Sequence, residues 1–116
     1  GDLAFHDYEG VAVDLDERER IVADLGDKDA MLLRNHGTLT VGRNVAECFV
    51  KLYFLERACQ AQIMALSAGD KVNSPPQGAA EIAAQQGMAG LSIAANMLAW
   101  PALKRKVYRL DPSFAS

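Results

Sequence analysis

The spacing of apolar positions along the chain predicts four helices. Leu15–Gly26 begins with acidic residues and ends on glycine, as a short surface helix does. From Val45 to Ala68 apolar residues recur every three to four positions, which indicates one long helix. Gly78–Ala99 is rich in alanine and small residues and is predicted as a third helix, open to interruption at its glycines. Pro101–Leu110 is predicted as a short fourth helix that proline starts.

Two short strands joined by a polar turn are predicted within Met31–Gly42. Ala30–Leu33 is continuously apolar, which predicts a strand buried on both faces. Thr38–Gly42 alternates polar and apolar residues, as a second strand would. The turn between them carries His36 and Gly37, so one imidazole lies where a site could form. A lone histidine in a turn is more often a solvated or structural residue than a ligand.

Local signals also place the ends of the long helix. Asn44 followed by Glu47 three positions later has the spacing of a capping box, which predicts the start of the helix. Gly69 is predicted to end it. Residues 70–77 contain two consecutive prolines, which cannot continue a helix, so they are predicted to be an internal linker.

The long helix carries aromatic residues and both cysteines. The helical spacing of Phe49, Tyr53 and Phe54 favours the core or a subunit interface over a ligand box. Cys48 and Cys59 are separated by roughly 16 Å in a helix, too far for a disulfide. We expect both thiols to be reduced and to lie on a buried helical face.

Composition excludes some function classes. The 116 residues, half of them apolar, suffice for one domain with a core. A formal net charge of −3 makes nucleic acid an unfavourable partner. Without a signal segment or an apolar run near the ~20 residues of a membrane span, the chain is expected to be cytoplasmic. It also begins abruptly at Gly1 in sequence that looks interior, which suggests a truncated chain.

A basic group occupies the predicted fourth helix. Lys104–Lys106 and Arg109 could bind a phosphate, although a solvated helix face is the simpler interpretation. Both interpretations remain open from the sequence alone.

Several motifs in order resemble the class II aldolase/adducin family. The ending, Trp100–Leu103 followed by Asp111–Ser113, resembles its bacterial adducin-related branch. The motifs shared with the family at large are His6–Gly10, Leu15–Gly26, Leu33–Leu39 and Ala46–Cys59. The resemblance implies an α/β protein with the family's three-layer α/β/α fold. Residues 1–116 would be a truncated, helix-rich C-terminal part of that single domain.

The resemblance also implies a metal site. Aldolases and epimerases of this family hold a divalent ion, typically zinc, with three histidines, and act on sugar phosphates beside a carbonyl. The family's His-Gly corner corresponds to His36 and Gly37, which makes His36 the implied third metal ligand. The other two ligands, a His-x-His pair, and an acidic base lie upstream in the family and are absent from this sequence. His6, Asp7 and Tyr8 lie near the position of a proton-donating tyrosine in the aldolases, but His6 does not match the pair.

Two functions therefore stay open. The first is a segment of a zinc-dependent aldehyde-lyase that is inactive by itself, because a catalytic zinc needs three protein ligands. The second is a non-enzymatic interaction or oligomerisation module like an adducin head. Family members form homo-oligomers, and unpaired sheet edges in a truncated chain would favour association.

Overall fold

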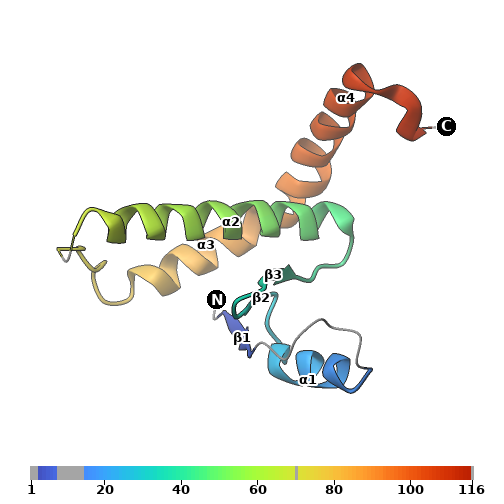
Figure 1. Ribbon diagram of the computed structural model, residues 1–116. Coiled ribbons are helices and arrows are strands. Elements are labelled where there is room, and N and C mark those ends of the chain that lie inside the picture. Colours follow the sequence, from blue (N-terminus) through green and yellow to red (C-terminus); the bar gives the residue numbers. More distant parts are fainter. Residues whose placement is uncertain (1–2, 8–14, 70, 116) are drawn as a thin grey trace.

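The computed structural model describes residues 3–7, 15–69 and 71–115. They form a mixed α/β structure in which helices outweigh strands, as the sequence predicts. A small sheet lies between two helices, and a helical hairpin with a projecting last helix extends from it (Figure 1). The radius of gyration is 17.0 Å, whereas a compact domain of this length has about 13 Å. Much of the helical surface is therefore exposed.

The sheet has the strand order β1-β2-β3. Strand β1 (Ala4–His6), which the sequence pattern does not predict, pairs in parallel with β2 (Ala30–Leu33). Helix α1 (Leu15–Leu25) follows β1 and precedes β2, and Gly26 ends it with a φ of 57°. Strand β3 (Gly37–Thr40) pairs antiparallel with β2. In the described residues, β1 and β3 each pair along one edge only.

The two faces of the sheet carry different helices. The register aligns Met31 with Ala4 and Leu39, so these three side chains share a face. His6 is two residues from Ala4 and shares that face, where its ring contacts Asp24 of α1. Side chains of β3 on the other face contact α2 (Val45–Ser67) instead. Helices α1 and α2 therefore cover opposite faces of the sheet.

The prediction that β2 is buried on both faces is only half right. Met31 is fully buried beneath α1, but Ala30, Leu32 and Leu33 are half-buried. For Ala30 and Leu32 the reason is that α2 packs mainly over β3 and contacts β2 less, whereas Leu33 shares the face of Met31 and is the last residue of the strand. The face of β2 on the side of α2 is therefore only partly covered.

Helix α2 begins where the sequence predicts. The Asn44 side chain accepts a hydrogen bond from the Glu47 backbone N–H at 3.0 Å, which is one half of a capping box. The other half differs, because the Glu47 carboxylate accepts from the Arg43 backbone N–H at 3.1 Å. Gly42 lies just before Arg43, and if it carried a side chain, its Cβ would lie 3.0 Å from the Glu47 Cβ. The connection from β3 thus passes close to α2, and a side chain at this position would press on the first turn of the helix.

The third and fourth predicted helices form one continuous helical segment. Helix α3 (Ala79–Ile93), a π-helical segment η1 (Ala94–Ala99) and α4 (Trp100–Leu110) follow without a break, and the glycines of α3 do not interrupt it. The irregularity lies instead just before Pro101, where the Trp100 N–H donates to the Ala95 carbonyl. Proline lacks an N–H and its ring clashes with the preceding turn, so a wider turn accommodates it.

The helical core is small. Buried Ala46 and Val50 of α2 pack against buried Ala95 of η1, with Leu91, Ala99 and Trp100 around them. The small side chain of Ala95 allows the two helices to approach closely. The described residues of the linker, 71–77, are exposed and form neither helix nor strand, and Asp70 lies outside the described residues.

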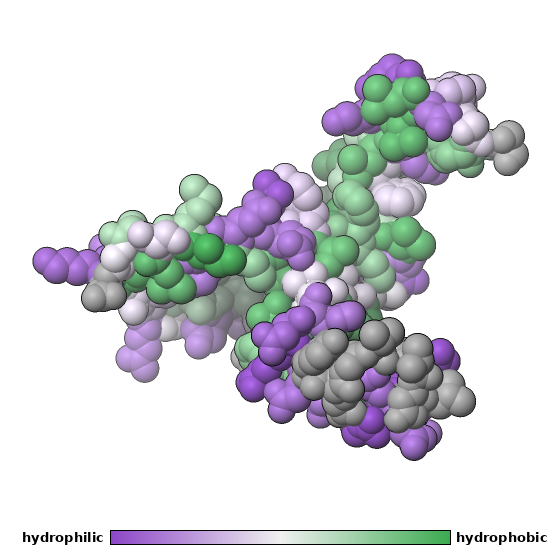
Figure 2. Space-filling view, viewed as in Figure 1, coloured by the Kyte–Doolittle hydropathy of each residue, from purple (hydrophilic) through white to green (hydrophobic). Residues whose placement is uncertain are grey.

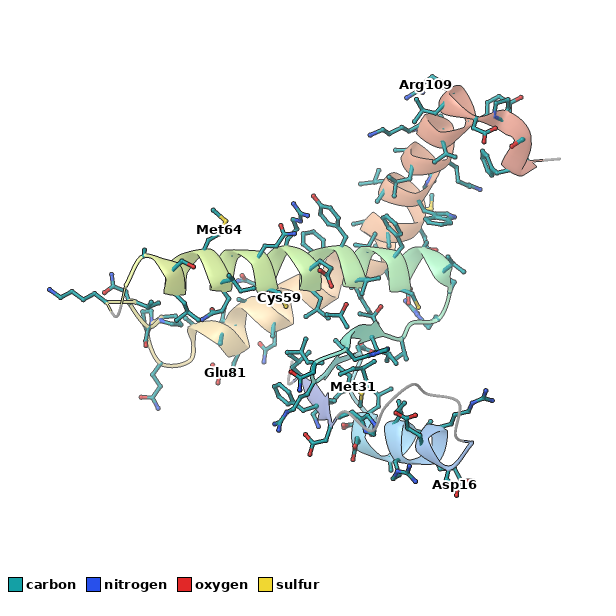
Figure 3. The ribbon with its side chains drawn as sticks, viewed as in Figure 1. Asp16, Met31, Cys59, Met64, Glu81 and Arg109 are labelled. Carbon is teal, nitrogen blue, oxygen red and sulfur yellow. The ribbon has the colours of Figure 1, made fainter. Side chains whose placement is uncertain are left out.

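The aromatic residues of α2 are not core residues. The side chains of Phe49, Tyr53 and Phe54 are 42%, 52% and 59% exposed, so the core interpretation is wrong and the interface interpretation remains. Figure 2 shows hydrophobic residues facing solvent over α2 and around its junction with α4. Met64 likewise points into solvent from α2 (Figure 3). Cys48 and Cys59 are half-buried, and neither forms a disulfide.

Candidate functional site

His36 lies in the tight turn that joins β2 to β3. The His36 backbone N–H donates to the Leu33 carbonyl at 3.0 Å, which closes the turn. Asn35 occupies its third position with a φ of 55°, as a type II turn requires. The His36 side chain is exposed. The turn therefore presents an imidazole on a backbone that hydrogen bonds fix.

A charged pair lies at the same end of the sheet. The Arg34 guanidinium contacts the Asp7 carboxylate at 3.1 Å and lies 5.6 Å from the centre of the Phe5 ring. Because β1 and β2 are parallel, Asp7 and Arg34 both follow the carboxyl ends of their strands. Ligands of α/β proteins commonly bind at that edge. Tyr8, the other residue singled out near this position, lies outside the described residues.

His6 is not part of this corner. Its ring is 4% exposed, and its Nδ1 lies 2.7 Å from an Asp24 carboxylate oxygen of α1. Its Nε2 is buried without a hydrogen-bond partner and lies 3.8 Å from the buried Glu17 carboxylate. The structure thus gives His6 a structural position between β1 and α1.

The described residues do not by themselves complete a metal site. They contain no group of three histidine, cysteine, aspartate or glutamate residues that could hold an ion. His36 alone provides one imidazole, whereas a catalytic zinc takes three protein ligands. Cys48 and Cys59 are on α2 and do not join it in such a group.

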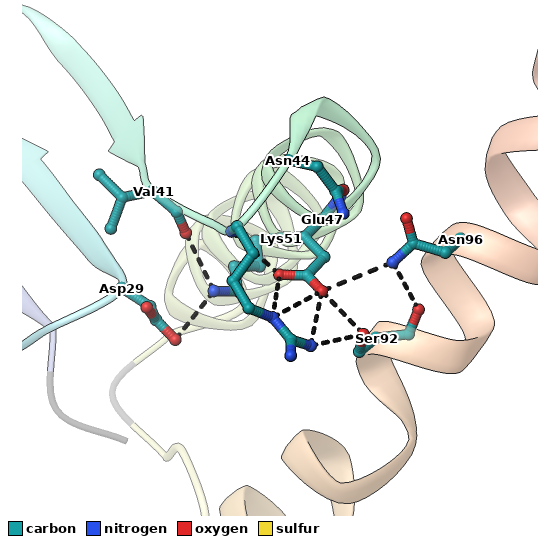
Figure 4. Close-up of polar contacts among 8 residues, drawn as sticks. Asp29, Val41, Asn44, Glu47, Lys51, Ser92 and Asn96 are labelled. Atoms are coloured by element: carbon teal, nitrogen blue, oxygen red, sulfur yellow. Dashed lines mark hydrogen bonds and ion pairs between the residues drawn. The ribbon is translucent and has the colours of Figure 1, made fainter.

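A second polar cluster lies at the opposite end of β2 and β3, around Glu47 (Figure 4). The Glu47 side chain is almost completely buried. Its carboxylate accepts hydrogen bonds from Arg43 Nη2 at 2.8 Å and from Ser92 Oγ at 2.7 Å. Asn96 Nδ2 lies 3.5 Å away. Glu47 therefore connects the start of α2 to α3 and η1.

The Glu47 cluster borders an open cleft of about 450 Å³. The ammonium group of Lys51 contacts the Asp29 carboxylate and the Val41 carbonyl, each at 2.9 Å. Arg43 is paired with Glu47. Each cation of the cleft is thus neutralised by a carboxylate, which fits a structural connection better than an anion site. The i, i+4 spacing of Arg43 and Glu47 in the sequence indicates their ion pair. No local feature of the sequence indicates that Ser92 also donates to Glu47.

The pKa of Glu47 predicts a loss of stability in acid. Hydrogen bonds from Arg43 and Ser92 lower this pKa from 4.5 to about 2. Between these values the unfolded chain binds a proton that the folded chain does not, so stability falls as the pH falls. The urea midpoint of the native protein should exceed that of Glu47→Gln most at pH 6, and the difference should shrink towards pH 2. A difference independent of pH would contradict this role.

Comparisons with known proteins agree on one family. The profile described as "Class II Aldolase and Adducin N-terminal domain" matches residues 1–63. A Caulobacter vibrioides protein whose name proposes an aldolase of class 2 is 54% identical over 97% of the chain. Alpha-adducin of Mus musculus is 45% identical over 63% of the chain and 10% of its own length.

A solved structure is also similar. The crystal structure of an aldolase II superfamily protein from Pseudomonas syringae matches with a TM-score of 0.79 and 44% identity. The match covers 96% of this chain and 45% of that one. The Caulobacter vibrioides protein is covered over 44% of its length. The chain thus spans less than half the length of these two relatives.

Proposed function

The chain belongs to the class II aldolase and adducin family, and from this premise we propose that it is part of a metal-dependent enzyme of the aldolase type. The observation that carries the proposal is the exposed His36 imidazole in the β2–β3 turn. His36 would be one ligand of a divalent ion, with zinc as the first candidate. The further ligands and the catalytic base would lie outside the described residues.

The proposed reaction class is carbon–carbon cleavage or epimerisation beside a carbonyl. The substrate would be a small carbonyl compound or a sugar phosphate. Asp7 and Arg34 lie at the same strand ends as the His36 turn, where a substrate could approach the ion. Arg34 is held in an ion pair with Asp7, so an anionic substrate would compete with that carboxylate for the guanidinium.

We also propose that residues 1–116 form the C-terminal part of one larger domain with three α/β/α layers. The position of α1 and α2 on opposite faces of the sheet supports this arrangement. The relatives of roughly twice the length support it as well.

None of the helices in the described residues is long and apolar enough to cross a membrane.

Metal analysis of the purified protein after dialysis against a zinc buffer tests this function. A longer protein that supplies the proposed further ligands should hold about one zinc ion per chain, whereas residues 1–116 alone should hold little. His36→Gln should reduce the zinc content at least tenfold, because glutamine keeps the size of the side chain and loses the imidazole. Asn35→Gly is the matched control in the same turn, since glycine adopts positive φ readily. Its zinc content should equal that of the native protein.

Two results would contradict the enzyme proposal. One is a longer protein with the proposed further ligands that holds no zinc, and the other is its His36→Gln variant that holds as much zinc as the control. Either would favour the second candidate function, an adducin-head-like module that acts through association. The similarity to alpha-adducin and the exposed aromatic face of α2 support that candidate.

Both candidate functions include a homo-oligomer. Association would cover the apolar side chains exposed on α2 and α4. It would also cover the edges of β1 and β3 that have no partner strand among the described residues. Sedimentation of the same preparation should give a mass of at least two chains. A monodisperse monomer would contradict the oligomer and the association module together, whereas it would leave the zinc measurement to decide the enzyme.

A further inference from the structure

Helix α4 concentrates positive charge that no carboxylate of the described residues neutralises. Within the described residues, no carboxylate forms an ion pair with Lys104, Arg105, Lys106 or Arg109. Ion pairs join carboxylates to Arg34, Arg43 and Lys51, whereas single cations such as Lys28 and Arg57 have none among the described residues. The whole chain carries a net charge of −3, so the grouping of four cations on one short helix is what distinguishes α4.

The charged residues are not spread evenly around α4. Lys104, Arg105, Tyr108 and Arg109 follow the i, i+1, i+4, i+5 spacing and therefore lie on one face of the helix. Lys106 lies outside this face. A tyrosine ring is thus flanked by three cations, at the end of the chain that projects furthest from the sheet (Figures 1 and 2).

The short 3-10 helix η2 (Pro112–Ala115) follows α4 and brings Phe114 back to this face, which stays open to solvent. The Asp111 carboxylate accepts a hydrogen bond from the Ser113 backbone N–H at 3.0 Å and fixes the bend. Phe114 then packs edge-on against Tyr108, with ring centres 6.5 Å apart and planes at 82°. The result is an open cleft of about 490 Å³, lined by both rings and by Lys104, Arg105, Arg109 and Ala115.

We propose that this cleft binds a small ligand with a planar aromatic ring and a phosphate, of the nucleoside phosphate class. The phosphate would bind Arg105 and Arg109, because guanidinium groups match phosphate oxygens in geometry and charge. The aromatic ring would stack on the exposed surfaces of Tyr108 and Phe114. The volume of the cleft lies within the usual range for small-molecule sites.

The helix dipole does not explain the whole basic cluster. A cation in the last turn stabilises a helix, and Arg109 is the basic residue of the last turn of α4. Lys104 and Arg105 lie in the middle of the helix, beyond the reach of that effect. A ligand site explains why mid-helix cations, two aromatic rings and a cleft occur together. The site is separate from the His36 turn and does not depend on the function proposed there.

Calorimetric titration of the purified protein with ATP tests this site. ATP should bind saturably, and Arg109→Gln should weaken binding at least tenfold, since it removes a guanidinium from the cleft. Phe114→Ala should weaken binding several-fold through lost stacking. Lys106→Gln is the control, because it removes one positive charge from the same helix at a residue that does not line the cleft. Its affinity should stay within threefold of the native value.

Three outcomes would overturn the proposal. The first is no saturable binding at millimolar ATP. The second is an equal loss of affinity in Lys106→Gln and Arg109→Gln, which would indicate attraction to the net charge alone. The third is inorganic tripolyphosphate that binds as tightly as ATP, together with an unaffected Phe114→Ala, which would exclude recognition of the aromatic ring. Circular dichroism of each variant checks that the helices remain folded.

Discussion

Replacing Met31 with alanine is expected to lower the free energy of unfolding by about 3 kcal/mol. Met31 lies on the central strand and is fully buried among the described residues. Its side chain fills the space between the sheet and α1, beside Ala4 and Leu39 (Figure 3). Truncation would remove apolar contacts and leave a cavity that the short strands cannot close. Urea denaturation followed by circular dichroism measures the effect.

Met64 provides a control of the same residue type. Its side chain is 73% exposed on α2, so Met64→Ala should change the free energy of unfolding by less than about 0.5 kcal/mol. Similar losses in the two variants would mean that the sheet and α1 do not form the stable part of this protein. A large loss in Met64→Ala alone would instead place the stabilising contacts on the outer surface of α2, in an assembly.

Replacing His6 with alanine is expected to cost about 2–4 kcal/mol of unfolding free energy. The substitution removes the 2.7 Å contact between Nδ1 and Asp24. It also leaves the buried Glu17 carboxylate without the ring that faces it at 3.8 Å. The loss should appear in urea denaturation and as faster hydrogen exchange in α1, because these contacts hold α1 on β1.

A second substitution separates the two contributions of His6. If the unpaired Glu17 charge causes part of the loss, adding Glu17→Gln to His6→Ala should recover some stability. Phe5→Ala is the neighbouring control in β1, and its ring is 51% exposed on the opposite side of the strand. It should cost less than His6→Ala. A larger loss in Phe5→Ala would show that the His6 contacts contribute little.

The secondary structure was largely predictable because its signals are local. Helical spacing placed α2 within a residue of its observed end, and Gly26 ended α1 as predicted. The sequence predicts an interruption at the glycines of Gly78–Ala99 and a separate helix from Pro101, whereas the irregular turn lies just before Pro101 in a continuous helical segment. Proline disturbs the helical turn that precedes it, because it lacks an N–H and its ring meets that turn. The glycines of α3 leave the helix intact.

The candidate site was predictable only in part. The sequence placed His36 in a turn between two strands, which the structure confirms, while its role as a metal ligand stays a prediction. The sequence did not indicate the structural position of His6, because Glu17 and Asp24 reach it only after α1 folds onto β1. The shared strand end of Asp7 and Arg34 likewise follows from the parallel pairing of β1 with β2.

The sequence by itself determined the helices, the β2–β3 hairpin and the family, since these depend on periodicity, caps and motifs within short segments. Only the tertiary structure decided which side chains are buried. The aromatic face of α2 looks like core in the sequence but is exposed, whereas the charged Glu47 is buried by Ser92 and Asn96 from a distant helix. Burial depends on which segments meet in space, and local spacing cannot specify contacts between segments far apart in the chain.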